Sequence, residues 1–230
     1  MYTIELLQAI NDWQAEGFEE NKQDLAKKIK KESARLHKKF KTLNENCFRR
    51  VDLVGKHTLQ IGTELKLPET YSSWTFDVLI AQNFYDGVPE VGYQGVIFKL
   101  NPSDNDYEVI INLNELFSDK DFTNFCEKYK AKINNYDNGI GRFGNYEKEL
   151  VLDVSELKME QIYAYGGYSS SKEYFAQKYF GHSPNAEELI FFKKLLKKDN
   201  IPIGAKWVTG RAKDRIVKFH INKAKLLAKH

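Results

Sequence analysis

The chain has 230 residues, of which 42% are hydrophobic and 29% charged, and its formal net charge is +3. This composition excludes a disordered chain, which would lack the apolar surface needed to offset the entropy of ordering. No apolar run approaches the roughly 20 residues that span a bilayer, and the two cysteines are too few for a disulfide framework. The first residues do not resemble a secretory signal, so we expect a cytoplasmic protein with reduced thiols.

The predicted elements run from helical, through β-rich, to mixed along the chain. Apolar residues at helical spacing predict two helices in the first 40 residues, carried by Ile4, Leu7, Ile10 and Trp13 and then by Leu25, Ile29 and Leu36. From Phe48 short apolar runs predict strands at 48–54, 57–62, 95–100, 107–113, 149–154 and 157–165. Helices are predicted at 77–85, 119–134, 171–180 and 185–198, a mobile glycine-rich loop at 134–145, and closing strands at 206–210 and 215–221.

This order predicts an α+β protein in three parts: a helical part over 1–46, a β-rich core over 47–165 and a basic extension over 166–230 packed on the core. Charge divides the chain differently. The net charge is −5 over residues 1–21, +7 over 22–41, −9 over 42–192 and +10 over 193–230. Basic segments at the borders of an acidic body indicate a polyanionic partner, although lysine-rich helix faces that are merely solvated would read the same way.

Familiar catalytic and metal-binding motifs do not occur in the sequence. It has no Walker loop, GxSxG, HExxH or CxxC, and its five histidines lack metal-ligand spacing, so we expect no metal. Three short groups remain: Phe48-Arg49-Arg50, Tyr71-Ser72-Ser73-Trp74-Thr75, and Glu147-Lys148-Glu149 at the start of an apolar run. Period-two geometry would place both carboxylates on one strand face, where like charges repel. Each group alone also has a structural explanation as an ion pair, a turn or a solvated strand.

In this order the three groups resemble the Arg, Ser-x-Ser/Thr and Glu-x-Glu signature of mono-ADP-ribosyltransferases of the cholera-toxin-like class. The resemblance extends to residues 62–84, GTELKLPETYSSWTFDVLIAQNF, and to the following runs GVIFKL and EKELVL, and it covers roughly residues 47–165. It implies a split β-sandwich core that binds NAD⁺ as a substrate and uses no metal. Arg50 competes with Arg49 for the arginine position, and Ser72 offers a second register for the serine motif.

The resemblance also implies a role for each residue. Arg49 would clamp the phosphates of NAD⁺, Ser73 would fix the catalytic carboxylate Glu149, and Glu147 would orient or deprotonate the acceptor. Thr75 would brace the turn, and the other residues expected to contact the cofactor are Phe84, Tyr85 and Tyr93. The residues expected to contact the acceptor lie in or beside the glycine-rich loop: Tyr136, Arg142, Phe143 and Tyr146.

The Glu-x-Glu form implies a protein arginine as the default acceptor, and the basic extension favours an RNA or DNA base as the alternative. Such an enzyme would be a toxin of a toxin–antitoxin system with a neutralising antitoxin, a phage-defence effector or a phage enzyme. Two other classes remain: a non-enzymatic nucleic-acid-binding module, and a catalytically dead relative that serves as a scaffold.

Overall fold

A computed structural model describes residues 2–15, 21–54, 65–67, 70–84, 89, 93–166, 172–198 and 207–227. The chain divides into two units, each built from three stretches of sequence. Unit 1 comprises Met1–Arg49, Leu65–Val78 and Lys99–Leu157, and unit 2 comprises Arg50–Glu64, Leu79–Phe98 and Lys158–His230. The predicted mixed α+β class is confirmed, and the strands pair antiparallel. No helix in the described stretches is long and apolar enough to cross a membrane.

The helices of unit 1 lie mostly before β1 and after β5. They are α1 (Ile4–Ala15), α2 (Lys22–Glu32), α4 (Leu113–Ser118) and α5 (Lys120–Tyr129), with short 3₁₀ turns η2 (Ser33–Arg35), η3 (Lys38–Lys41), η6 (Lys130–Lys132) and η7 (Tyr136–Asn138). Its strands are the first half of β1 (Cys47–Val54), β2 (Leu65–Lys66), β3 (Tyr71–Thr75), β5 (Glu108–Asn112), β6 (Glu149–Asp153) and β7 (Glu156–Leu157). The sheet order is β5-β6-β3-β1, and β2 pairs separately with β7.

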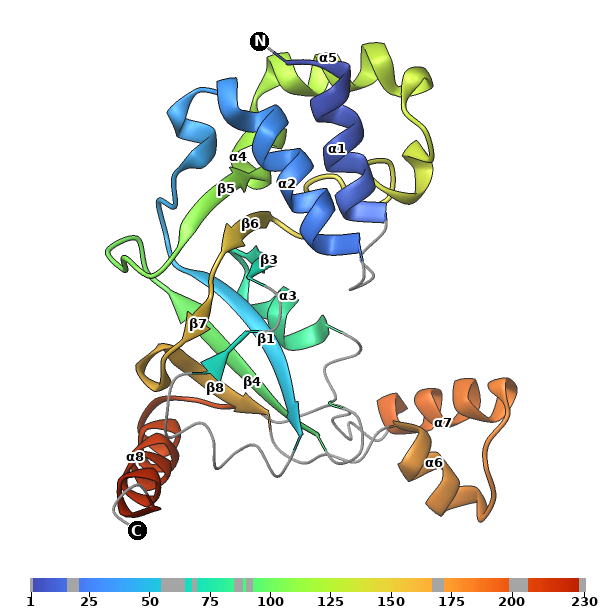
Figure 1. Ribbon diagram of the computed structural model, residues 1–230. Helices are drawn as coiled ribbons and strands as arrows, with labels where there is room; N and C mark the ends of the chain where they lie inside the picture. The colour runs from blue at the N-terminus through green and yellow to red at the C-terminus, as the bar shows by residue number, and fades with distance from the viewer. Residues whose placement is uncertain are drawn as a thin grey trace. The chain divides into compact units, whose positions relative to one another are not determined.

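Figure 1 shows α1, α2, α4 and α5 grouped beside β5 and β6, and one hydrophobic core joins these helices to the sheet. Apolar residues at helical spacing on α1 and α2 meet β5, β6, α4 and α5, through residues such as Leu7, Ile10, Ile29, Ile111, Leu116, Phe122 and Val151. Burying this many aliphatic and aromatic side chains supplies the main stabilising free energy of the unit. The strand β6 is central in the sheet and buried on both faces, so the N-terminal helices pack against the strand that carries Glu149.

Unit 2 continues from β1 and adds the C-terminal elements. Its sheet order is β1-β4-β8-β9, with β4 (Tyr93–Leu100), β8 (Ile162–Gly166) and β9 (Trp207–Val208). Its helices are α3 (Val78–Asn83), α6 (Lys172–Phe180), α7 (Ala186–Lys198) and α8 (Gly210–Leu227), with the 3₁₀ turn η8 (Met159–Gln161) before β8. The helices α6 and α7 pack through Ala176, Phe192 and Leu196.

Several local predictions are wrong. Residues 215–221 were expected as a strand but lie inside α8, because Ile216, Val217, His220 and Ile221 fall on one half-buried helical face. Residues 157–165 are broken by η8, and the second helix ends at Glu32, before Leu36. The strand β3 and the helix α4 were not expected, and the strand predicted at 57–62 lies outside the described residues.

The two cysteines are free and buried, one on β1 and one on α5. Burial raises the pKa of the Cys47 thiol and that of the Cys126 thiol to about 12, because the thiolate would lose its hydration. Both side chains therefore remain neutral thiols at physiological pH and act as small apolar residues of the core.

Candidate functional site

The first residue of β6, Glu149, is a buried carboxylate with 4% of its surface exposed. The pattern Glu-Leu-Val-Leu alternates between the two faces of the strand, as predicted, and Leu150 and Leu152 are fully buried on one of them. Val151 shares the face of Glu149 and joins the core beneath α1 and α2. An acidic side chain is rarely this buried without partners, so its hydrogen bonds define the site.

The serine motif lies on β3, which pairs antiparallel with β6 so that Thr75 is opposite Glu149 and Ser73 is opposite Val151. Ser73 therefore lies on the same sheet face as Glu149, and its Oγ donates a 2.6 Å hydrogen bond to Glu149 Oε1. Ser72 points to the opposite face, is fully buried and accepts a hydrogen bond from Trp74 Nε1. Of the two serine registers left open by the sequence, only that of Ser73 meets the carboxylate.

The third residue of the motif ties β3 to the turn that precedes β6. Thr75 Oγ1 donates a 2.7 Å hydrogen bond to the Glu147 carbonyl oxygen and accepts one from the Asp77 backbone N–H. At the same turn, Lys148 Nζ lies 3.0 Å from Asp77 Oδ2. Thr75 thus fixes the backbone on which Glu147 is carried.

Glu147 is not on β6, which corrects the expectation that both carboxylates share one strand face. Lys148 has φ +46, in the left-handed region, so the chain turns between the two glutamates and period-two geometry does not apply. The two groups nevertheless interact. Burial, and then the negative charge of Glu149, raise the pKa of Glu147 to about 7, because both disfavour a second negative charge there.

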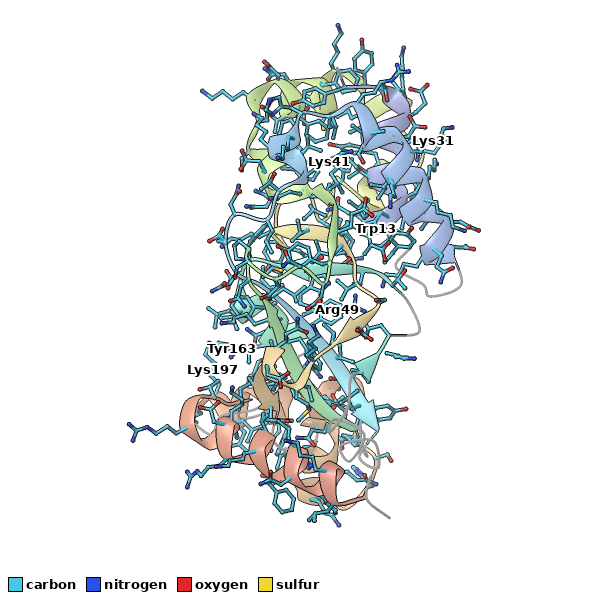
Figure 2. The ribbon with its side chains drawn as sticks, turned by 60° about the vertical axis from the view of Figure 1, so that its left-hand side comes forward. Trp13, Lys31, Lys41, Arg49, Tyr163 and Lys197 are labelled. Carbon is cyan, nitrogen blue, oxygen red and sulfur yellow. The ribbon has the colours of Figure 1, made fainter. Side chains whose placement is uncertain are left out.

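Two donors to Glu149 come from α1 and were not anticipated as site residues. Trp13, buried on the face of α1 toward the sheet (Figure 2), donates from Nε1 to Glu149 Oε1 at 2.6 Å. Gln14 Nε2 donates to Glu149 Oε2 at 3.3 Å and to the Gly144 carbonyl oxygen at 3.0 Å. The sequence signal was Gln8, Asn11 and Gln14 at three-residue spacing beside the apolar stripe, an arrangement more polar than a core helix requires.

This polar stripe also holds the glycine-rich segment, which was expected to be mobile. Asn11 Nδ2 donates to the Asn134 carbonyl oxygen at 2.9 Å, and Asn11 Oδ1 accepts from the Ile140 backbone N–H at 3.0 Å. A Cβ on Gly139 would lie 2.4 Å from Asn11 Oδ1, so the close approach of the segment to α1 requires glycine there. The segment is a series of tight turns, including η7, anchored to α1.

The four residues expected to contact an acceptor differ in exposure. Tyr136 packs against the hydrophobic core, and burial raises the pKa of its hydroxyl. Arg142 and Tyr146 are exposed, the latter at 80%, and the Arg142 guanidinium lies 5.1 Å from the centre of the half-buried Phe143 ring. Arg142 and Tyr146 are therefore accessible, whereas Phe143 and Tyr136 are half-buried, and Tyr136 packs against the core of unit 1.

The two candidate arginines belong to different units and have different surroundings. The Arg50 side chain is 3% exposed, pairs with both carboxylate oxygens of Asp52 at 2.7 and 2.9 Å, and donates to the Phe84 carbonyl oxygen. Its guanidinium also lies 5.6 Å from the Trp207 ring centre. Arg49 (Figure 2) is half-buried in unit 1 and follows Phe48, whose backbone is paired with Thr75. Three of the five guanidinium N–H donors of Arg50 are thus bonded within unit 2.

None of the aromatic residues expected to contact the cofactor is described in unit 1. Phe84 and Tyr93 belong to unit 2, with exposures of 47% and 37%, and Tyr85 lies outside the described residues. Unit 1 brings together Ser73, Thr75, Glu147 and Glu149. Across the described stretches no three His, Cys, Asp or Glu side chains are grouped as metal ligands.

The helix α8 presents a basic stripe to solvent, formed by Arg211, Arg215, Lys218 and Lys225 with Asn222. Helical spacing places these side chains within about one fifth of the helix circumference. Phe219 and Leu226 are exposed along one edge of the stripe, at 62% and 63%. Such cations bind the phosphates of a nucleic acid, and an exposed aromatic ring beside them can stack on a base.

Comparison of the chain with protein-family models, with curated proteins and with solved structures finds no match. The candidate site therefore has to be interpreted from its own geometry.

Proposed function

We propose that this protein is a mono-ADP-ribosyltransferase that moves ADP-ribose from NAD⁺ to a macromolecular acceptor. The observation that carries the proposal is the 2.6 Å hydrogen bond from Ser73 to Glu149 on neighbouring strands. The sequence motif requires a serine that fixes the catalytic carboxylate, and only the Ser73 register supplies one. Glu147 beside the same carboxylate adds a second acidic group with its pKa near neutrality.

In the proposed reaction the glycosidic bond between the nicotinamide nitrogen and the ribose C1′ breaks, and nicotinamide leaves with the bonding electrons. Positive charge then develops on the ribose, and the Glu149 carboxylate stabilises it electrostatically and binds a ribose hydroxyl. The acceptor nucleophile forms a bond to C1′ and gives its proton to Glu147. A carboxylate with a pKa of about 7 is suited to accept that proton near neutral pH.

Binding of NAD⁺ in this proposal uses Arg49, whose planar guanidinium matches two phosphate oxygens. Arg50, the alternative, pairs with Asp52 and donates to the Phe84 carbonyl oxygen. Phe84, Tyr85 and Tyr93 remain proposed contacts of the nicotinamide end. The corresponding fold proposal is a split β-sandwich NAD-binding core over residues 47–165, with NAD⁺ as substrate and no metal.

The acceptor we propose is a protein arginine, as the Glu-x-Glu form implies. It would be presented by the segment that carries Arg142, Phe143 and Tyr146, because Arg142 and Tyr146 are exposed beside the site. A cytoplasmic toxin with a neutralising antitoxin, a phage-defence effector and a phage enzyme are the settings in which such a transferase would act.

The basic stripe on α8 favours a second candidate, in which the acceptor is an RNA or DNA base. Arg211, Arg215 and Lys218 would hold phosphates, and Phe219 would stack on a base. The same stripe would serve a non-enzymatic nucleic-acid-binding module. That reading predicts that replacing Glu149 leaves every activity intact.

The test incubates purified protein with NAD⁺ labelled in the adenylate and a cell lysate, and then treats half of each sample with protease and half with nuclease. Glu149→Gln keeps the shape of the side chain and removes its charge, so label transfer should fall by more than about 1000-fold. Glu127→Gln, an exposed glutamate on α5, is the matched control and should behave as wild type.

Label that depends on Glu149 and disappears with protease supports modification of protein. Label that disappears with nuclease moves the acceptor to RNA or DNA. No label and no released nicotinamide from the folded wild-type protein would refute the transferase proposal and leave the binding module.

A further inference from the structure

The carboxylate of Glu149 is held from two sides, and one of them is the N-terminal helix. Ser73 on β3 and Trp13 on α1 both donate to Oε1 at 2.6 Å, and Gln14 on α1 donates to Oε2 at 3.3 Å. Donors on both oxygens fix the rotation of the carboxylate about its last bond, as well as its position. Two of these three donors lie about 135 residues before Glu149 in the chain.

All three donors are neutral, which matters for what the carboxylate can do. A cation paired with Glu149 would neutralise the negative charge, whereas N–H and O–H dipoles orient the charge and leave it available to a cation that develops nearby. The Trp13 ring in turn lies 5.8 Å from Lys22 Nζ, which is placed over the ring. Trp13 is therefore oriented by contacts at its ring face and at its N–H.

The orientation of the Gln14 amide leaves its oxygen without a hydrogen-bond partner in the described part of the chain, and the donor role of its nitrogen explains this orientation. Its Nε2 reaches two acceptors, the Gly144 carbonyl oxygen and Glu149 Oε2, while its Oε1 is buried and has no hydrogen-bond partner among the described residues. A buried acceptor without a partner is destabilising, and an apolar side chain here would avoid that. The amide thus places its two hydrogens where a carboxylate and the glycine-rich segment need them.

The helix that carries these donors is itself anchored. Asn11 and Gln8 bond to the backbone of residues 134–140, and Leu6, Leu7 and Ile10 are buried in the core of unit 1. A donor on an anchored helix holds a carboxylate in a fixed place, as preorganised catalysis requires.

We propose that Trp13 and Gln14 are positioning residues, which hold the Glu149 carboxylate in the orientation that the ribose cation requires. This inference rests on the proposed transferase function and adds the N-terminal helix to its active site. Neither residue touches substrate; both act through Glu149.

The kinetic test compares Trp13→Phe and Gln14→Met with Trp74→Phe, using release of nicotinamide from NAD⁺. Trp13→Phe keeps an aromatic ring and loses only the N–H donor, and Gln14→Met keeps the length of the side chain. Trp74 is the matched control, since it is a buried indole whose N–H bonds to Ser72 and not to Glu149. We expect kcat to fall about 10- to 100-fold in Trp13→Phe and severalfold in Gln14→Met, with KM changed less than about threefold. Trp74→Phe should keep kcat within about threefold of wild type.

A second readout does not depend on activity. The chain has three tryptophans, so ¹⁵N-labelled indole gives three N–H signals, and Trp13→Phe assigns one of them by its loss. An indole proton in a short bond to a carboxylate resonates downfield, and Glu149→Gln should move the Trp13 signal upfield. The Trp207 signal should stay in place, because the Trp207 ring contacts the Arg50 guanidinium and the indole that donates to Glu149 is that of Trp13.

A folded Trp13→Phe protein whose kcat equals that of Trp74→Phe would overturn the inference. An indole N–H chemical shift of Trp13 that is unchanged in Glu149→Gln would overturn it as well. If the wild-type protein releases no nicotinamide, the transferase proposal fails. The indole signals then decide the remaining claim: a shift in Glu149→Gln supports the hold on the carboxylate, and no shift overturns it.

Discussion

Two buried charged side chains, Glu149 in unit 1 and Arg50 in unit 2, are stabilised in opposite ways. Arg50 meets the full opposite charge of Asp52 in a two-point pair, a backbone carbonyl oxygen and the face of Trp207. Glu149 receives its hydrogen bonds from an indole, a hydroxyl and an amide, each of which is neutral. Both arrangements satisfy a buried charge, but only one of them also neutralises it.

The difference separates the structural role of Arg50 from the chemical role that we propose for Glu149. A guanidinium paired with a carboxylate and stacked on a ring has little left to offer a ligand. A carboxylate oriented by dipoles keeps its negative charge and its fixed position, which are the two properties that stabilise a developing cation. Arg50 therefore belongs to the framework of unit 2, and Glu149 is the group on which the proposed transfer reaction would depend.

The largest effect that we expect from testing this comparison is a loss of stability on replacing Arg50. Arg50→Ala should lower the free energy of unfolding by about 3 kcal/mol, because Asp52 and the Phe84 carbonyl oxygen lose their partner while the cavity beside Trp207 opens. Urea denaturation of the variant and wild type measures this loss. Arg49→Ala is the matched variant, in which the proposed function predicts weaker NAD⁺ binding. A loss of stability below about 1 kcal/mol in Arg50→Ala would contradict the structural role.

The next effect compares two adjacent serines that face opposite sides of β3. Ser73→Ala removes a donor to Glu149, so NAD⁺ turnover should fall about 10- to 100-fold with little change in stability. Ser72→Ala leaves the buried N–H of Trp74 without its acceptor and should cost about 1–3 kcal/mol of stability while turnover is kept. Turnover assays and thermal melts on both variants check that Ser73→Ala loses turnover and Ser72→Ala loses stability. Equal loss of turnover in the two would break the distinction.

The smallest effect concerns Glu147, which burial and the Glu149 charge hold at a pKa of about 7, above the value of 4.5 expected for an exposed glutamate. A group whose pKa is raised in the folded state stabilises it below the unfolded pKa and loses that contribution as pH rises through the folded pKa. Stability should therefore decline from about pH 4.5 to 7. Since the side chain is partly exposed, Glu147→Gln should be more stable than wild type by only about 1–2 kcal/mol at pH 8, and equal to it near pH 4.5.

Urea midpoints across that pH range measure the effect, with the exposed Glu127→Gln as control. A Glu147→Gln protein that gains no stability at pH 8 would show that Glu147 is already hydrated. In Glu149→Gln the pKa of Glu147 should fall, because the negative charge of Glu149, one of the two causes of the raised pKa, is removed.

The sequence predicted the elements whose apolar pattern is strong. The helix at the N-terminus, the strands around Phe48, Ile97, Ile110 and Val151, and the helix around Phe122 appear where their periodicity placed them. Weak or ambiguous patterns failed. The β-branched run RIVKFHI was assigned to a strand, yet at 3.6 residues per turn the same residues line one half-buried face of α8. Tyr71–Thr75 was seen only as a motif, because its alternation is too short to distinguish a strand from a turn.

The sequence by itself determined which residue types stand in which order: an arginine after an aromatic residue, a serine group, and a glutamate pair opening an apolar strand. Only the tertiary structure decided which of them meet. The register of β3 against β6 places Ser73, and not Ser72, on the face of Glu149. The left-handed backbone conformation of Lys148 turns the chain, so that Glu147 lies outside the strand. The folding of α1 back onto β6 brought Trp13 to Glu149, 136 positions away in the chain. Local patterns encode faces and periods, whereas contacts across such separations follow from how the hydrophobic faces pack together, which no short stretch of sequence contains.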